Sequence, residues 1–151
     1  MAAVVDVPQA VVNTLNAAPG PPWSQPFTAT RHYLPIHEKS DLAALTVTVA
    51  PRTIEGERLT RGQMQDDLVI DIAIQQACEP TNDAAIDVLV NIVDAIKQYL
   101  RTTILTGTTG ARFVKDKNDP IYSPQHLVKE GIFTSILSVT YLYVSTAATT
   151  G

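Results

Sequence analysis

The sequence predicts an α+β fold, in which a mixed, mainly antiparallel sheet of about four to five strands is flanked by a long helix and an N-terminal helix. Two neighbouring segments indicate this class. Within residues 67–77, large apolar side chains occupy every second position from Leu68 to Ile74, which is the two-residue period of a strand with one buried face. Residues 83–101 place apolar side chains at three- and four-residue steps, as an amphipathic helix does. A strand that feeds such a helix gives a layer of helix on sheet.

The two patterns also predict which side chains are buried. In the strand, Asp71 and Gln75 point away from an apolar row that consists of Leu68, Ile70, Ile72 and Ile74. In the helix, the apolar stripe consists of Ile86, Leu89, Val90, Val93, Ile96 and Leu100. Asn82 or Thr81 is placed to cap this helix, and Asp83 lies at its positive end.

Size and composition indicate one domain. We expect a single domain over residues 1–151, with an opening helix at 3–17, a core at 25–144 and a flexible tail at 145–151. The formal net charge of −4 disfavours a protein that coats nucleic acid. The single cysteine, Cys78, excludes an internal disulfide and fits a reducing compartment. No secretion signal is visible and no apolar run approaches the ~20 residues of a membrane span, so we expect a soluble cytoplasmic product.

The first fifty residues predict a helix, a connector and two strands. Pro8 is an obstacle within the opening helix, because proline lacks an amide donor, so a start at Pro8 is the alternative to a start at residue 3. Residues 19–23 (Pro-Gly-Pro-Pro-Trp) cannot continue a helix, and we expect Trp23 to anchor this connector onto the core. Residues 27–34 and 43–50 predict strands, the second with a clean alternation of apolar residues and threonines.

A charged segment, residues 51–65, separates that strand from the next. It has no helical or strand period, and at about 15 residues it is longer than an ordinary hairpin connection. Such loops are usually functional or disordered, so we expect a loop that protrudes to meet a partner; the alternative is a solvated, mobile hairpin end. Charged side chains of this loop and of the following strand start are the candidate protein-interface residues, namely Arg52, Glu55, Glu57, Arg58, Arg61, Asp66 and Asp67.

Beyond the long helix, the chain predicts an edge strand and a buried strand. Residues 107–112 superficially suggest a phosphate loop, but they follow a helix and lack the lysine of that motif, so we expect an exit turn. Residues 112–117 carry the alternating charges of a sheet edge, and residues 121–124 are irregular. Residues 132–144 are apolar on both faces, which indicates a strand inside the sheet or one covered by a neighbouring subunit.

Catalytic and cofactor motifs are absent from the sequence, so we expect neither an enzyme nor a bound cofactor or metal. Nothing in the sequence indicates a pocket that would shift the pKa values of the paired acidic candidates for acid–base catalysis. The metal-ligating residue types are scattered rather than clustered, at His32, His37, His126 and Cys78. The serines without an activated-nucleophile context include Ser24, Ser123 and Ser135.

Several short strings resemble those of a family of phage proteins. These strings are Arg31 to Pro35, Val47 to Arg52, Arg58 to Gly62, Asn118 to Tyr122 and Phe133 to Tyr141. Together they look like the tail terminator (tail completion) proteins and related neck components of long-tailed bacteriophages. The resemblance covers residues 5–144.

The resemblance implies a structural virion protein whose subunits form a homo-oligomeric ring, commonly a hexamer, after assembly in the host cytoplasm. The ring would cap the head-proximal end of the tail, stop tail-tube polymerisation and provide the head-docking surface. Its partners would be the tail tube protein, which residues 51–65 would contact, and the head–neck connector protein. Viral DNA would pass through the lumen without specific binding, and no membrane would be involved.

A closed ring needs two different patches on each subunit. We expect the three candidate arginines to face the four candidate carboxylates across that contact, where complementary charges fix register more than they add affinity. Other functions stay open: a head-side neck or connector ring protein, a tail-tube-like subunit, or, in a different class, a small cytoplasmic enzyme or ligand-binding domain with a pocket between helix and sheet.

Overall fold

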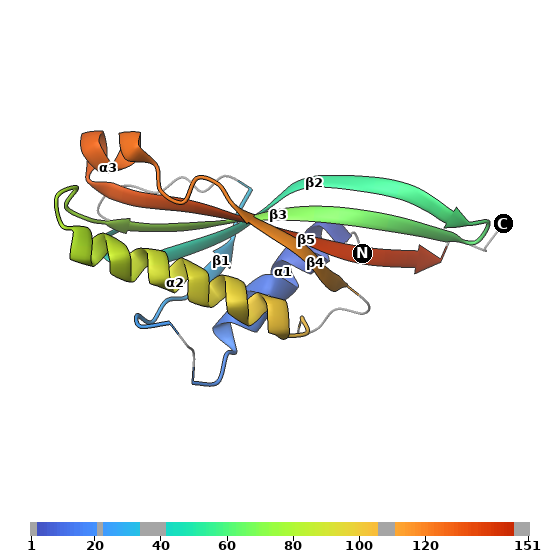
Figure 1. Cartoon of the computed structure of the whole chain (residues 1–151). Coiled ribbons are helices and arrows are strands. Elements are labelled where there is room, and N and C mark those ends of the chain that lie inside the picture. The colour runs from blue at the N-terminus through green and yellow to red at the C-terminus, as the bar shows by residue number, and fades with distance from the viewer. Residues whose placement is uncertain (1–2, 21–22, 34–41, 106–110, 147–151) are drawn as a thin grey trace.

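The computed structural model describes residues 3–20, 23–33, 42–105 and 111–146 of the chain (Figure 1). It confirms the expected α+β class. The elements are, in chain order, α1 (Ala3–Asn16), β1 (Ala29–Arg31), β2 (Thr46–Thr60), β3 (Gln63–Ala77), α2 (Asp83–Thr102), β4 (Arg112–Asn118), α3 (Pro124–Glu130) and β5 (Ile132–Thr146).

The strands form one five-stranded sheet in the order β1-β2-β3-β5-β4. Only β1 and β2 are parallel, and the other three pairs are antiparallel, so the sheet is mixed and mainly antiparallel as expected. The predicted edge strand is confirmed, because β4 is the outermost strand on its side. The last strand, β5, lies between β3 and β4, so its apolar residues on both faces belong to a strand inside the sheet.

The hydrophobic core lies on one face of the sheet, where α1 and α2 pack (Figure 1). Because residues directly opposite in neighbouring strands share a face, the pairing register assigns every strand residue of the core cluster to this side. The strands' main contributions to the core are Val47, Val49, Leu68, Ile70, Ile72, Ile74, Phe133, Leu137, Val139 and Tyr141. We call the opposite face of the sheet the open face.

Helix α2 begins and packs as its pattern predicts. The side chain of Asn82 caps it by accepting a hydrogen bond of 3.1 Å from the backbone amide of Ala85. Its fully buried residues are Leu89, Ile92, Val93, Ile96 and Leu100. Ile86 and Val90 are partly buried against the same core. Ile92 lies three residues after Leu89 and four residues before Ile96, so it belongs to the buried stripe, although it was missing from the predicted one.

The N-terminal segment confirms the anchoring role of Trp23 and the opening helix expected from residue 3, and it rules out the alternative start at Pro8. Trp23 is 7% exposed, and its ring meets Tyr99 of α2 edge-on, with ring centroids 5.5 Å apart. Helix α1 starts at Ala3 and contains the buried Pro8. The missing amide of Pro8 removes one hydrogen bond from the helix. Burial of the apolar face of α1, with Val11 fully buried, compensates for it.

The prediction of a loop at residues 51–65 is wrong. Strand β2 continues to Thr60 and β3 starts at Gln63, so only Arg61 and Gly62 connect the two strands. Every residue from Arg52 to Thr60 is exposed. A strand without a buried face has no alternation of apolar and polar residues, so the period that identifies a strand is missing here. Two register shifts, between Pro51 and Thr53 and between Arg58 and Thr60, interrupt the pattern further.

The C-terminal third contains one helix that the sequence reading missed. Ser123 caps α3 by accepting a hydrogen bond from the amide of His126, and Gly131 ends it in the left-handed conformation at φ 66°. Figure 1 shows α3 on the side of the sheet opposite α2. The predicted tail boundary at residue 145 is also wrong, because β5 runs to Thr146. Residues 147–151 lie outside the described residues, and so do residues 107–110 of the expected exit turn.

Candidate functional site

Strands β2, β3 and β5 are each 15 residues long, and they extend past α2 as a three-stranded projection (Figure 1). We call residues 53–60, 63–67 and 142–146 the arm. Its position follows from the sequence, since the buried core cluster stops at Leu68 on β3 and at Val49 on β2. Beyond those points no side chain of the three strands belongs to the buried core cluster, and most side chains of β2 are charged or polar, with Ile54 and Leu59 as exposed apolar exceptions.

All seven predicted interface residues lie on the arm or at its base. Arg52 is at the base, in the register shift of β2, and Arg61 is in the turn at the tip. The other five are on the paired strands. The register separates them by face: Glu55 pairs with Asp67 on the open face together with Glu57, whereas Arg58 and Asp66 lie on the helix side.

The acidic side chains on the open face of the arm oppose one another rather than a cation. Glu55 and Asp67 are directly opposite, an arrangement that destabilises an antiparallel pair. No ion pair within 4.0 Å joins either of them to a cation in the described part of the chain. Arg52, the nearest candidate, instead has its Nη1 3.8 Å from Oδ1 of Asp71. Repulsion between these carboxylates therefore destabilises the arm, and a cationic partner would relieve this repulsion.

On the helix side of the arm, Gly56 and Asp66 are directly opposite. A Cβ atom added to Gly56 would lie 2.9 Å from Oδ1 of Asp66, which is closer than real Cβ contacts. The Asp66 carboxylate therefore lies across the bare backbone of Gly56. This packing explains the glycine at a position whose φ is ordinary for a strand.

A second charged feature lies at the opposite edge of the sheet. Arg112, Lys115 and Lys117 of β4 are exposed, and we call them the basic edge. The register pairs them with Leu142, Thr140 and Ser138, so all three lie on the open face. Lys117 also has its Nζ 3.5 Å from Oδ2 of Asp119, with both side chains mostly exposed. The open face is thus acidic at the arm and basic at the other edge.

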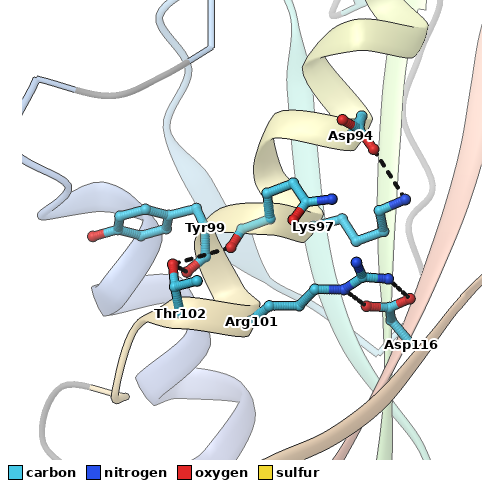
Figure 2. A network of polar contacts seen from close by, with 7 residues as sticks. Asp94, Lys97, Tyr99, Arg101, Thr102 and Asp116 are labelled. Carbon is cyan, nitrogen blue, oxygen red and sulfur yellow. Dashed lines mark hydrogen bonds and ion pairs between the residues drawn. The ribbon is translucent and has the colours of Figure 1, made fainter.

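The basic edge is held in place by a contact on the other side of β4. Figure 2 shows the guanidinium of Arg101, at the end of α2, reaching the carboxylate of Asp116. Both Nε and Nη2 donate to it, and the Nη2–Oδ1 distance is 2.9 Å. The hydrogen bond to Asp116 raises the pKa of Arg101. Because Asp116 is turned to the helix side, the alternate residues Lys115 and Lys117 are directed to the open face.

The described residues contain no group of three or more His, Cys, Asp or Glu side chains that could hold a metal ion. His37 lies outside them. His126 is on α3, where its Nδ1 lies 3.1 Å from Oγ1 of Thr134. Ser123 is a helix cap, and Ser135 accepts a hydrogen bond of 2.9 Å from Asn118. These contacts give each of the three residues a structural role.

Shallow pockets of about 360 to 440 Å³ lie at the rim of the fold. Two adjoin Cys78, whose pKa is raised by burial and then by the charge of Glu79, so the thiolate form is disfavoured. The third lies where the end of α2 meets β4 and β5, and Tyr141 lines it. Burial raises the pKa of Tyr141 above its ordinary value of 10.0. Neither group is activated for chemistry near neutral pH.

Tyr141 gives a prediction of its own, because its buried hydroxyl has no hydrogen-bond partner among the described residues. Tyr141→Phe should leave the free energy of unfolding unchanged at neutral pH or raise it by about 1 kcal/mol, since an unsatisfied buried group is removed. Above pH 10.0 the unfolded chain loses the phenolic proton and the folded chain keeps it, so wild-type stability should fall relative to the variant.

Denaturant unfolding measured from pH 7 to pH 11 checks both parts. Tyr143→Phe is the matched control, because Tyr143 lies on the same strand and face but is only partly buried. A Tyr141→Phe variant that is clearly destabilised at pH 7 would show that the hydroxyl has a partner.

No family model matches the chain, and no curated protein matches its sequence. Among the described helices, none is both long and apolar enough to cross a membrane. The site must therefore be interpreted from its own geometry.

The sequence pattern indicates the charged residues of the arm but not the basic edge. It predicts only edge protection for residues 112–117. Strict alternation along a strand would place Arg112 and Lys115 on opposite faces. The register shift between Phe113 and Lys115 instead brings Arg112, Lys115 and Lys117 to the same face, so alternation alone does not predict it.

Proposed function

We propose that the chain is a structural virion protein that forms a ring at the head-proximal end of a phage tail. There it ends tail-tube polymerisation and provides the surface on which the head docks. The partners in this proposal are further copies of the chain, the tail tube protein and the head–neck connector protein, with viral DNA passing through the lumen unbound. The protein acts by surface complementarity, without catalysis.

The observation that carries the proposal is the arm. It projects beyond the core and exposes charged side chains on both faces. None of its residues belongs to the buried core cluster. A projection of this kind has no use in stabilising its own subunit, so its use lies in contact with another molecule. The strings that resemble tail terminator proteins also lie along it: Arg58 to Gly62 forms its tip, and Phe133 to Tyr141 leads into its third strand.

The sheet–helix space argues against the ligand-binding alternative. Core side chains fill the space between α2 and the sheet, with Ile72, Ile96 and Leu137 each 0% exposed. A metabolite pocket at that position would require a cavity lined by a few convergent polar groups. The pockets at the rim lie elsewhere.

Electron micrographs of tails assembled with and without this protein test the proposal. Without it, we expect tails of uncontrolled length, and addition of the purified protein should restore a uniform length. Tails of uniform length that fail to join heads would instead favour the head-side neck protein. Open-ended tubes formed by the purified protein alone would favour a tube subunit.

A further inference from the structure

The sheet has two unoccupied edges in the described part of the chain. One is the outer edge of β4. The other is the arm portion of β2, because β1 pairs with β2 only from Val47 to Val49 and leaves Thr53–Thr60 uncovered. Unpaired backbone amides and carbonyls at such an edge form a template for another strand.

The two edges carry opposite charges on the same face. One row of directly paired residues crosses the sheet as Arg112, Leu142, Asp67 and Glu55. It begins with a cation of the basic edge and ends with an anion of the arm. Glu57 follows Glu55 on the same face, as Lys115 and Lys117 follow Arg112. Contact between unlike edges is therefore attractive, whereas two arms or two basic edges would repel each other.

Apolar side chains lie at the same two edges. Ile54 and Leu59 on β2 are each 46% exposed, and Val114 on β4 is 50% exposed. An edge that serves only to stay solvated would carry charged residues without exposed apolar residues such as Ile54 and Val114. By the register, Ile54 lies on the helix side, opposite the face that carries Glu55 and Glu57, so a strand docked on this edge would cover apolar and charged side chains together, as in a specific protein interface.

Strand direction and spacing permit the two edges to pair. Each step β2–β3, β3–β5 and β5–β4 is antiparallel, so β2 and β4 run in opposite directions. A second copy with its open face turned the same way therefore presents β4 antiparallel to β2. Without stagger, Asn118 would meet Val49, a position that β1 already occupies. A stagger of about two residues, or ~7 Å, toward the arm tip avoids β1 and places Arg112 beside Glu57 and Lys115 beside Glu55.

We propose that the partner of the arm is a second copy of this chain: Thr53–Glu57 of β2 pairs with β4 of the neighbour, and Glu55 and Glu57 face Lys115 and Arg112. The contact is head-to-tail, and such contacts close into a ring when the rotation between copies permits it. The inference rests on the ring assembly proposed above and names the surfaces that build it. The stagger supplies the strand tilt that closure of a sheet requires.

A charge exchange tests this contact. Sedimentation velocity of the wild type should show a closed oligomer. Glu55→Lys with Glu57→Lys should sediment as the monomer, and so should Arg112→Glu with Lys115→Glu. All four substitutions together restore the net charge and the attraction, and should restore the oligomer. Higher salt should dissociate the wild-type oligomer, because the pairs lie at an accessible rim.

The matched control is Glu79→Lys with Glu130→Lys, which makes the same change in net charge at exposed sites away from both edges. It should keep the oligomer. Circular dichroism confirms that each variant folds. If a double variant does not fold, the single substitutions Glu57→Lys and Arg112→Glu, alone and combined, give the same test.

The outcomes separate this inference from the proposed function. A wild-type oligomer that survives both edge variants would overturn the β2–β4 contact and leave the ring intact. A wild-type monomer at all concentrations would overturn both. An oligomer that responds to the charge exchange but leaves tail length uncontrolled would support the contact and overturn the tail-terminating role.

Discussion

Replacement of Ile96 by alanine is expected to lower the free energy of unfolding by about 3 kcal/mol. Ile96 is 0% exposed and lies on the α2 face that packs against the sheet. Its neighbours in the sheet are held by ladder hydrogen bonds on both sides, so they cannot move to fill the space that the side chain leaves. Since a domain is stable by only about 5–15 kcal/mol, this one change removes a large share of the total.

Chemical denaturation measures the effect as a shift of the midpoint at constant slope. Val88→Ala is the matched control, since Val88 is on the same helix and 42% exposed. Its substitution should change the free energy of unfolding by no more than about 0.5 kcal/mol. Equal losses from the two variants would mean that α2 is not held by burial of the face described here.

The second large effect is expected at the arm tip. Arg58→Glu together with Arg61→Glu should abolish tail completion in an assembly assay while leaving folding intact. Both side chains are exposed and neither is in an ion pair within 4.0 Å in the described residues, so their replacement removes no intramolecular contact of that kind. The reversal of charge acts only on a partner that approaches the tip, which in our proposal is the tail tube protein.

Lys129→Glu is the control for that variant, because Lys129 is exposed on α3, at the far end of β5 from the arm. It should complete tails at the wild-type rate. Sedimentation of the double variant separates two causes of a loss, since a tube-contact defect leaves the ring assembled. Normal tail completion by the double variant would mean that the tip is simply a solvated hairpin end.

The parts of the fold that the sequence predicts are those with one buried face. Along β3, large apolar residues occupy every second position from Leu68 to Ile74, and along α2 they recur from Leu89 to Leu100. Both patterns follow from contact with a single core, so both can be recognised without any knowledge of the partner element. The edge position of β4 was predictable for a related reason, because its charges leave no face for a core.

The arm and α3 could not be predicted in this way. From Glu55 to Glu57 the chain is a strand solely because β3 pairs with it, and no side-chain periodicity records that pairing. Helix α3 buries only Leu127, so its signals are confined to its ends: the cap Ser123, Pro124 in the first turn and the terminating Gly131. The basic edge was missed for a further reason: faces are defined only once the register is known, and one register shift in β4 changes which residues share a face.

The connectivity of β3 also determines the order in which the molecule can form. A two-residue turn brings β2 to one side of β3, but the strand on the other side, β5, arrives from far along the chain, with Gln63 paired to Thr146. Closure of so long a loop is entropically costly, so the β3–β5 ladder should form late in folding. During synthesis the hairpin and α2 precede β5. The third strand of the arm is therefore completed last, and β4 has no neighbour in the sheet until β5 arrives, so an unfinished chain cannot yet form the edge contact that we propose.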